Sequence, residues 1–271
     1  MALVTTGEIL ENQNFVLAVN VIMLEQAEAF IAAAEQVGTG LVLQLSENTV
    51  AFHGSLSPMA LALFSIARQS SQKIAVHLDH ATSTDLVIEA IELGFSSVMF
   101  DGSKLEFAQN LEKTAELASL AKRSGCWFEA ELGEVGGKDG VHAPGVRTDP
   151  EHAKEFVSKT AIDGLAVAVG SSHAMLDKSA ELDFELIREL AAAVPVPLVL
   201  HGSSGVSRAN LKLAIQSGIR KVNLATELNV VFNQALLTAI DPSKLGDPRK
   251  FLRPAREALT DYLSELIREL S

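Results

Sequence analysis

Three histidines stand where apolar runs of the sequence end. His80 closes IAVHLDH, His173 closes LAVAVGSSH and His201 closes PLVLH. If these runs are strands of one parallel barrel, the three imidazoles converge at its open face, because barrel sites are built at the carboxyl ends of the strands. Three histidine ligands with a free fourth position form a catalytic metal arrangement rather than a structural one. Asp79 is the neighbour of His80, so the sequence also predicts a carboxylate next to the metal.

The strands and helices that must position these residues are predicted from a pattern in the sequence: short apolar runs alternate with longer stretches of helical periodicity. Strands are expected over Val16–Val21, Leu41–Leu45, Ile74–Leu78, Ser97–Phe100, Trp127–Glu131, Leu165–Val169, Leu198–Leu200 and Lys221–Leu224. Helices are expected over Leu24–Val37, Pro58–Gln69, Thr84–Leu93, Leu105–Arg123, Phe184–Ala193, Arg208–Ser217 and Glu227–Ala239, with a last amphipathic helix over about Pro254–Leu270. Strands that alternate with helices imply a parallel sheet. Eight such units predict an α/β fold, a closed (β/α)8 TIM barrel with an extra C-terminal helix, and an open doubly wound sheet is the alternative.

Length, composition and charge narrow the class of protein. The chain has 271 residues, 48% of them hydrophobic, which is typical of a soluble globular protein, and one barrel domain over residues 1–271 is expected. The net charge of −12 comes without a basic patch, so no nucleic-acid partner is expected. No apolar run reaches the roughly 20 residues that span a bilayer, and the first residues lack a signal-peptide pattern, so no membrane partner is expected. With one cysteine, Cys126, interpreted as a core residue, we expect a cytoplasmic protein.

Polar side chains occupy the other predicted strand ends as well. They include Asn20, Ser46, Asp101, Glu131 and Asn223. A lone histidine after a strand is more often a packed residue than a ligand, and a lone aspartate there is usually a helix N-cap. Three histidines, two aspartates and a glutamate at one face are less easily explained in that way, so a metal site and separate structural roles are equally open at this point. The polar residues at the first two strand ends, Asn20 and Ser46, are expected to contact substrate.

Two turns have the composition of an anion site. The stretch HGSSG, His201–Gly205, leaves the seventh predicted strand, and NLATE, Asn223–Glu227, leaves the eighth. In such barrels the loops after strands 7 and 8 commonly bind phosphate through backbone N–H groups and a helix N-terminus. Either turn alone is equally well interpreted as a capped helix entry. Both together, in these two places, predict a phosphate site.

The ordered motifs HLDH, AELG followed by GG, AVGSSH, LVLHGSSG and KVNLATEL closely resemble those of the class II, metal-dependent fructose-bisphosphate and tagatose-bisphosphate aldolases, from about Ala18 to Ala239. The resemblance implies a homo-oligomer, a homodimer or homotetramer. It implies reversible cleavage of a ketose 1,6-bisphosphate, a phosphorylated sugar, to dihydroxyacetone phosphate and glyceraldehyde 3-phosphate. It also implies a catalytic Zn2+, a second divalent ion, and a monovalent cation, Na+ or K+, near the phosphate.

The resemblance further assigns roles to residues of this chain. His80, His173 and His201 match the zinc ligands, Asp79 matches the catalytic acid/base, and Asp101 and Glu131 match the second metal position. The residues at the dihydroxyacetone phosphate contacts are Ala174, Gly202, Ser203, Ser204, Asn223, Leu224, Ala225 and Thr226. Zinc would polarise the carbonyl as a Lewis acid, and Asp79 would take the C4 hydroxyl proton. Lys73 and Lys221 begin predicted strands, the wrong end of the barrel for a Schiff base.

Two positions depart from the family pattern. A glutamate usually follows GG on the long loop after the fifth strand and serves as the carbon acid/base. Here lysine, aspartate and glycine follow, so Asp139 is the candidate, with Glu134 and His142 as alternatives. Ala225 stands where fructose-type enzymes often have aspartate, which resembles the tagatose-type branch. That branch leaves open another ketose, such as a deoxy-ketogluconate phosphate, and a non-catalytic aldolase subunit; a metal hydrolase on the same scaffold is a further alternative.

Overall fold

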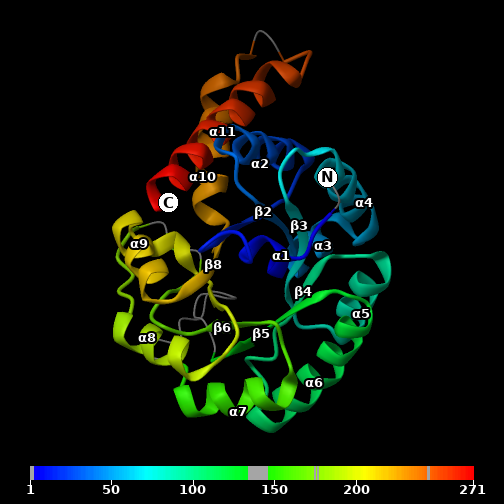
Figure 1. Ribbon diagram of the computed structural model, residues 1–271. Helices are drawn as coiled ribbons and strands as arrows, with labels where there is room; N and C mark the ends of the chain where they lie inside the picture. The colour runs from blue at the N-terminus through cyan, green and yellow to red at the C-terminus, as the bar shows by residue number, and fades with distance from the viewer. Residues whose placement is uncertain (1–2, 134–145, 174, 176, 243–244) are drawn as a thin grey trace.

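The computed structural model describes residues 3–133, 146–173, 175, 177–242 and 245–271. Parallel strands pair in chain order and close into an eight-stranded barrel, with β8 against β1 (Figure 1). The strands are β1 Val16–Asn20, β2 Leu41–Ser46, β3 Ile74–Ala81, β4 Ser97–Phe100, β5 Trp127–Leu132, β6 Gly164–Val167, β7 Leu198–Leu200 and β8 Ile219–Leu224. The predicted (β/α)8 barrel is confirmed, and the doubly wound alternative is wrong because the sheet has no open edge.

Helices form a ring around the strands (Figure 1). They are α2 Leu24–Val37, α4 Ser57–Gln69, α5 Thr84–Leu93, α6 Phe107–Arg123, α7 Pro150–Thr160, α8 Phe184–Ala193, α9 Arg208–Ser217 and α10 Thr226–Ala239. The C-terminal helix α11, Arg249–Leu270, packs on α10 and α2. The sequence predicted that this helix starts at about Pro254. In the structure the helix already begins at Arg249, and Pro254 lies inside it. The short helices α1 Thr6–Leu10 and α3 Glu47–His53 were not predicted from the sequence.

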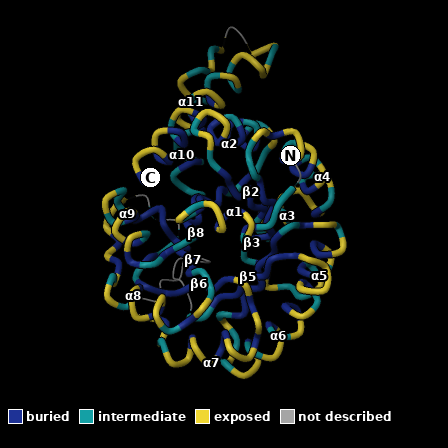
Figure 2. Tube along the Cα trace, viewed as in Figure 1, coloured by how far each residue is buried: buried dark blue, intermediate teal, exposed yellow. Residues whose placement is uncertain are grey.

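The core has an outer and an inner part, because successive side chains of a strand point to opposite faces. The outer faces of the strands pack against the helices in one large cluster. Figure 2 shows the barrel strands mostly buried and the outward sides of the helices exposed. Inside the barrel lie two smaller apolar clusters, one containing Val16, Ala18, Val42 and Ala75, the other Met99, Trp127, Ala166 and Val199. Five ionisable side chains are also fully buried: His77, Glu129, Glu131, His201 and Lys221. The barrel interior is therefore partly polar, which requires each of these groups to find a partner.

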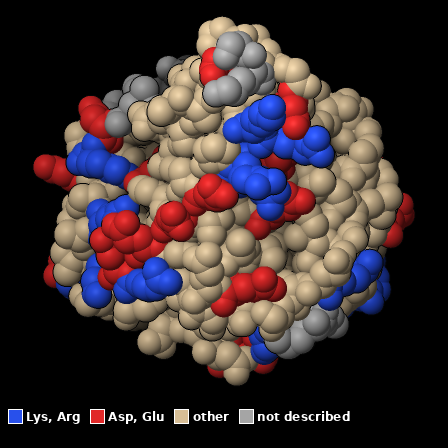
Figure 3. Space-filling model, turned by 90° about the horizontal axis from the view of Figure 1, so that it is seen from above, with Lys and Arg blue, Asp and Glu red and all other residues tan. Residues whose placement is uncertain are grey.

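The surface carries both signs of charge. On the face seen in Figure 3, Lys and Arg side chains are interspersed with Asp and Glu side chains. Among the described residues no single helix is long and apolar enough to cross a membrane; α3 and α4 meet that standard only as a pair, bent by 115°. Cys126 is buried, as predicted, and burial raises the pKa of its thiol to about 12.

Candidate active site

A cavity of about 730 Å³ opens at the carboxyl ends of the strands. Most of the predicted site residues line it: Asn20, Ser46, Asp79, His80, Asp101, His173, Gly202, Ser203, Ser204, Asn223, Ala225 and Thr226. Other lining residues were not predicted: Glu47, Asn48, Thr82, Lys104, Leu105 and Lys113. The residues that line the cavity therefore lie at or after the carboxyl ends of strands β1 to β4 and β6 to β8.

The three predicted histidines meet at this cavity. His80, His173 and His201 each offer a ring nitrogen, and these nitrogens lie within 4.8 Å of one another. The ring centroids of His80 and His201 are 4.4 Å apart, and those of His80 and His173 are 4.9 Å apart. Three imidazoles at this spacing have the ligand chemistry of a catalytic zinc site.

An irregularity of β3 brings Asp79 and His80 to the same cavity. By strand alternation, adjacent residues would point to opposite faces of the sheet. The pairing of β3 with β4 shifts register between Leu78 and Ala81, and His80 adopts a left-handed φ of 50°. A residue other than glycine held in this region costs about 1–3 kcal/mol, and such strain is concentrated at functional sites. The bulge thus aims two consecutive polar side chains into one cavity.

Gly202 lets the loop after β7 approach the segment that carries His173. Its φ is 65°, and a Cβ at this position would lie 2.7 Å from the backbone carbon of Ser172. Any larger residue would push the two loops apart. This contact keeps His201, next to Gly202, close to His173.

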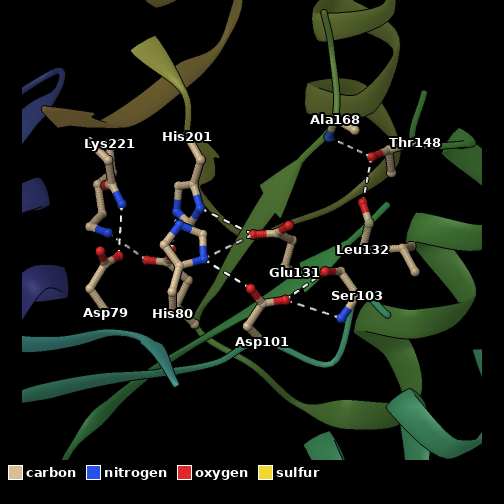
Figure 4. A network of polar contacts seen from close by, with 12 residues as sticks. Asp79, His80, Asp101, Ser103, Glu131, Leu132, Thr148, Ala168, His201 and Lys221 are labelled. Carbon is tan, nitrogen blue, oxygen red and sulfur yellow. Dashed lines mark hydrogen bonds and ion pairs between the residues drawn. The ribbon is translucent and has the colours of Figure 1, made fainter. Parts of the chain in front are cut away.

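Two carboxylates lie beside the histidines (Figure 4). Asp101 Oδ2 is 3.0 Å from His80 Nδ1, and its other oxygen accepts hydrogen bonds from the N–H and the hydroxyl of Ser103. Glu131 Oε2 lies 3.2 Å from His201 Nδ1 and 3.7 Å from His80 Nδ1. His80, Asp101 and Glu131 also meet the spacing of a metal site. The residues predicted for a second metal position are therefore brought together.

Asp79 is buried and held by two amides. Asn20 Nδ2 donates to Asp79 Oδ2 at 3.0 Å, and Asn223 Nδ2 donates to Asp79 Oδ1 at 3.1 Å. Gln44 in turn donates to Asn20 at 2.7 Å. Burial raises the pKa of Asp79, but the nearby charges of His80, His201 and Lys221 outweigh burial and lower it to about 2. Asp79 is therefore ionised near neutral pH, which is the form that can accept a proton.

Some predicted residues, and the further histidine His77, lie outside the cavity lining. Among the predicted residues, His201 and Glu131 are fully buried. Leu224 packs in the main hydrophobic core and does not line the cavity, because alternation along β8 turns it outward from Asn223. His77 is buried inside the barrel beside Trp127, and burial is the main cause that lowers its pKa to about 3. Asp139 and Ala174, with the alternatives at positions 134 and 142, lie outside the described residues.

Sequence reasoning missed a buried pair beneath the histidines. Lys221 Nζ lies 2.8 Å from Glu129 Oε2, and both side chains are completely buried. Burial raises the pKa of Glu129, but Lys221 and His201 outweigh it and hold that pKa well below its usual range. Strand alternation could have revealed Glu129, because it shares a face with Glu131 and Trp127.

Known proteins similar to this chain are aldolases. The model of the class II fructose-bisphosphate aldolase family matches residues 6–271. The solved structure of the YdjI aldolase from Escherichia coli K12 is 31% identical, with a TM-score of 0.81, over 95% of this chain and 91% of that one. The fructose-bisphosphate aldolase from Campylobacter jejuni is 24% identical, with a TM-score of 0.79, over 99% of this chain and 96% of that one, a likeness of fold alone.

Proposed function

This chain belongs to the class II fructose-bisphosphate aldolase family, and from this premise we propose that it is a zinc-dependent lyase that reversibly cleaves a ketose 1,6-bisphosphate to dihydroxyacetone phosphate and glyceraldehyde 3-phosphate. The main support for the proposal is that three imidazoles meet beside the ionised Asp79, at a cavity that Asp79, His80 and His173 line. A Lewis acid and a base at adjacent positions are what carbon–carbon cleavage next to a carbonyl requires.

The donor set fits a divalent metal ion. His80 Nε2 is buried and makes no hydrogen bond with any residue that the structure describes, as expected of an atom whose partner is a bound ion. Together with His173 and His201 it would hold the catalytic ion, and imidazole nitrogens favour zinc among the common metals. We assign the second divalent position to His80, Asp101 and Glu131.

The residues of the chain account for the proton transfers. A divalent ion held by the histidines would polarise the substrate carbonyl and stabilise the negative charge that develops beside it. Asp79 accepts the proton of the C4 hydroxyl while C4 becomes the aldehyde carbonyl and the C3–C4 bonding electrons remain on C3. Asn20 and Asn223 hold the Asp79 carboxylate in position. We assign protonation of C3 to Asp139 on the loop after β5.

The 1-phosphate is assigned to the loops after β7 and β8. The Ser203 hydroxyl donates to the carbonyl oxygen of Asn223 and so ties the two loops together. Ala225 occupies the N-cap of α10, and no side chain there caps the first backbone N–H groups of the helix. Uncapped N–H groups and the positive end of the helix dipole favour an anion at this point.

The opposite side of the cavity supports a second anionic group on the substrate. Lys104 and Lys113 both line the cavity, and they follow β4, which lies across the closed barrel from β8. In a chain with a net charge of −12, two lysines in a cavity wall supply a local positive field for a phosphate at the far end of the sugar. Both lysines are exposed, whereas a Schiff-base lysine is often desolvated in a hydrophobic pocket.

Replacing Lys113 with methionine tests that assignment. We expect KM for the bisphosphate to rise about five-fold, the equivalent of about 1 kcal/mol for an exposed charge pair. In the condensation direction, KM for uncharged glyceraldehyde should stay unchanged, because that aldehyde lacks the second phosphate. Lys122→Met on the same helix, outside the cavity lining, is the matched control. Equal effects on charged and uncharged aldehydes would contradict the role.

The proposed function is tested by a coupled assay for dihydroxyacetone phosphate, with fructose 1,6-bisphosphate and tagatose 1,6-bisphosphate compared side by side. We expect cleavage of at least one sugar, loss of activity after EDTA treatment and recovery after zinc is restored. The ratio of the two rates gives the C4 preference that Ala225 leaves open. Absence of cleavage in zinc-loaded protein would point instead to another phosphorylated ketose, hydrolysis, or a non-catalytic subunit.

Zinc binding should release a proton from His201. Burial lowers the pKa of this imidazole, but contacts with Glu129 and Glu131 outweigh burial and raise it to about 9. Below that pH the metal-free protein holds His201 protonated, and a ligand must lose its proton to bind metal. Zinc affinity should therefore rise with pH up to about 9. Calorimetric zinc titrations at pH 7.5, in buffers of different ionisation enthalpy, should detect release of about one proton or more; release of none would contradict this prediction.

A homo-oligomer is supported by the helical pair α10 and α11, which extends beyond the ring of helices (Figure 1). Leu237 near the end of α10 is 72% exposed, and Leu245 in the connection to α11 is 58% exposed. Large exposed apolar side chains that gather in one segment of a chain are typical of protein–protein contacts. We therefore propose that this pair takes part in the subunit interface.

A further inference from the structure

A lysine and a glutamate are paired inside the barrel without touching the cavity. Glu129 lies on β5 and Lys221 on β8, two strands that are not neighbours in the sheet, so the pair spans the interior. Both side chains are 0% exposed, and neither lines the cavity. Removal of two charges from water costs several kcal/mol for each ion, which apolar residues in their place would avoid. The pair therefore needs an explanation beyond filling space.

The second oxygen of Glu129 supplies that explanation. Glu129 Oε1 lies 2.9 Å from His201 Nε2, while Oε2 binds Lys221. An ionised carboxylate only accepts hydrogen bonds, so Nε2 of His201 must carry the hydrogen in this contact. In a neutral imidazole the other nitrogen, Nδ1, then presents its lone pair. That nitrogen faces Glu131 on the side where the three histidines meet.

Neighbouring groups fix the carboxylate itself. His77 Nε2 lies 3.9 Å from Glu129 Oε2, and the His77 ring packs against Trp127 at a centroid distance of 6.2 Å. Lys221 balances the negative charge of Glu129 inside the barrel, where the buried carboxylate is not solvated by water. Glu129 is thus held at both oxygens, and its orientation decides the orientation of the His201 ring.

We propose that Glu129, anchored by Lys221, is a positioning residue that fixes the ring and the Nε2–H tautomer of His201, so that Nδ1 is presented to the divalent ion. This inference rests on the proposed metal site. Neither residue of the pair is expected to touch substrate, since both lie outside the cavity lining. Outer partners of metal-bound histidines typically change metal affinity 10- to 100-fold, roughly, when they are replaced.

The test is zinc affinity of Glu129→Gln and of the double variant Glu129→Leu/Lys221→Met, measured by competition with a chromophoric chelator. We expect zinc to bind roughly 10- to 100-fold more weakly to both. The double variant removes both charges, so it is expected to fold even if a lone buried lysine destabilises Glu129→Gln. Long-range nitrogen–proton NMR spectra of the zinc-loaded proteins should show that His201 loses its uniform Nε2–H signature in the variants.

Asp163→Asn is the matched control, because Asp163 also accepts a hydrogen bond at β5, from the N–H of Phe128, but lies away from the histidines. It should bind zinc as the parent protein does. Parent-like zinc affinity and an unchanged His201 tautomer in a folded Glu129 variant would overturn the inference and leave the proposed function intact. Failure of the parent protein to bind zinc would overturn the proposed metal site, and the inference with it.

Discussion

Replacement of Asp79 by alanine is expected to lower kcat roughly 10²- to 10⁴-fold, the range that general acid–base groups contribute, while the protein keeps its zinc. Asp79 lies in the cavity beside His80 but does not belong to the three-histidine cluster. Its pKa of about 2 leaves it ionised throughout the neutral range, so its removal takes away the proton acceptor for the C4 hydroxyl. The metal ligands remain.

The measurement is steady-state cleavage, together with zinc content and thermal unfolding of the same preparations. The variant leaves the amides of Asn20 and Asn223 without their carboxylate partner, at a cost of about 1–3 kcal/mol for an unsatisfied buried group. A lower Tm is therefore compatible with the assignment as long as the protein is folded at the assay temperature. Normal turnover in a folded, zinc-loaded Asp79→Ala variant would exclude Asp79 as the base.

Replacement of His173 by alanine is expected to abolish both zinc retention and cleavage. His173 supplies one of three imidazole nitrogens that lie within 4.8 Å of one another, and the other two cannot complete a catalytic zinc site by themselves. Metal analysis after dialysis should find substoichiometric zinc, and excess zinc should restore little activity. Because His173 lies on the segment after β6, its removal leaves the barrel strands and their packing in place.

His152→Ala is the control for loss of a histidine as such. His152 is exposed on α7, where its ring lies 5.4 Å from that of Phe107, and it does not line the cavity. This variant should retain zinc and activity. If His173→Ala bound zinc as tightly as the His152 variant, the three-histidine site would be wrong.

The barrel itself could be predicted because its signals are local. Most strands are apolar runs, and the helices α2, α5, α8 and α9 have the bounds that their periodicity predicted. The helix α3 was missed because it is short and begins directly after Ser46, the last residue of β2, whose hydroxyl caps it. The lining lysines were missed as well, because Lys113 stands on a helix and reaches the cavity only through the packing of α6 beside β4 and β5.

The residues at the carboxyl ends of the strands can be identified from the alternation of strands and helices along the chain, because that order defines a parallel barrel, and such a barrel gathers those strand ends at one face. The directions in which their side chains point depend on the folded barrel. Simple alternation would have separated Asp79 from His80, and the shift of register against β4 brings them together. The pairing of Lys221 with Glu129 joins residues 92 positions apart across the barrel, a contact that no local pattern encodes because it depends on how the whole sheet closes.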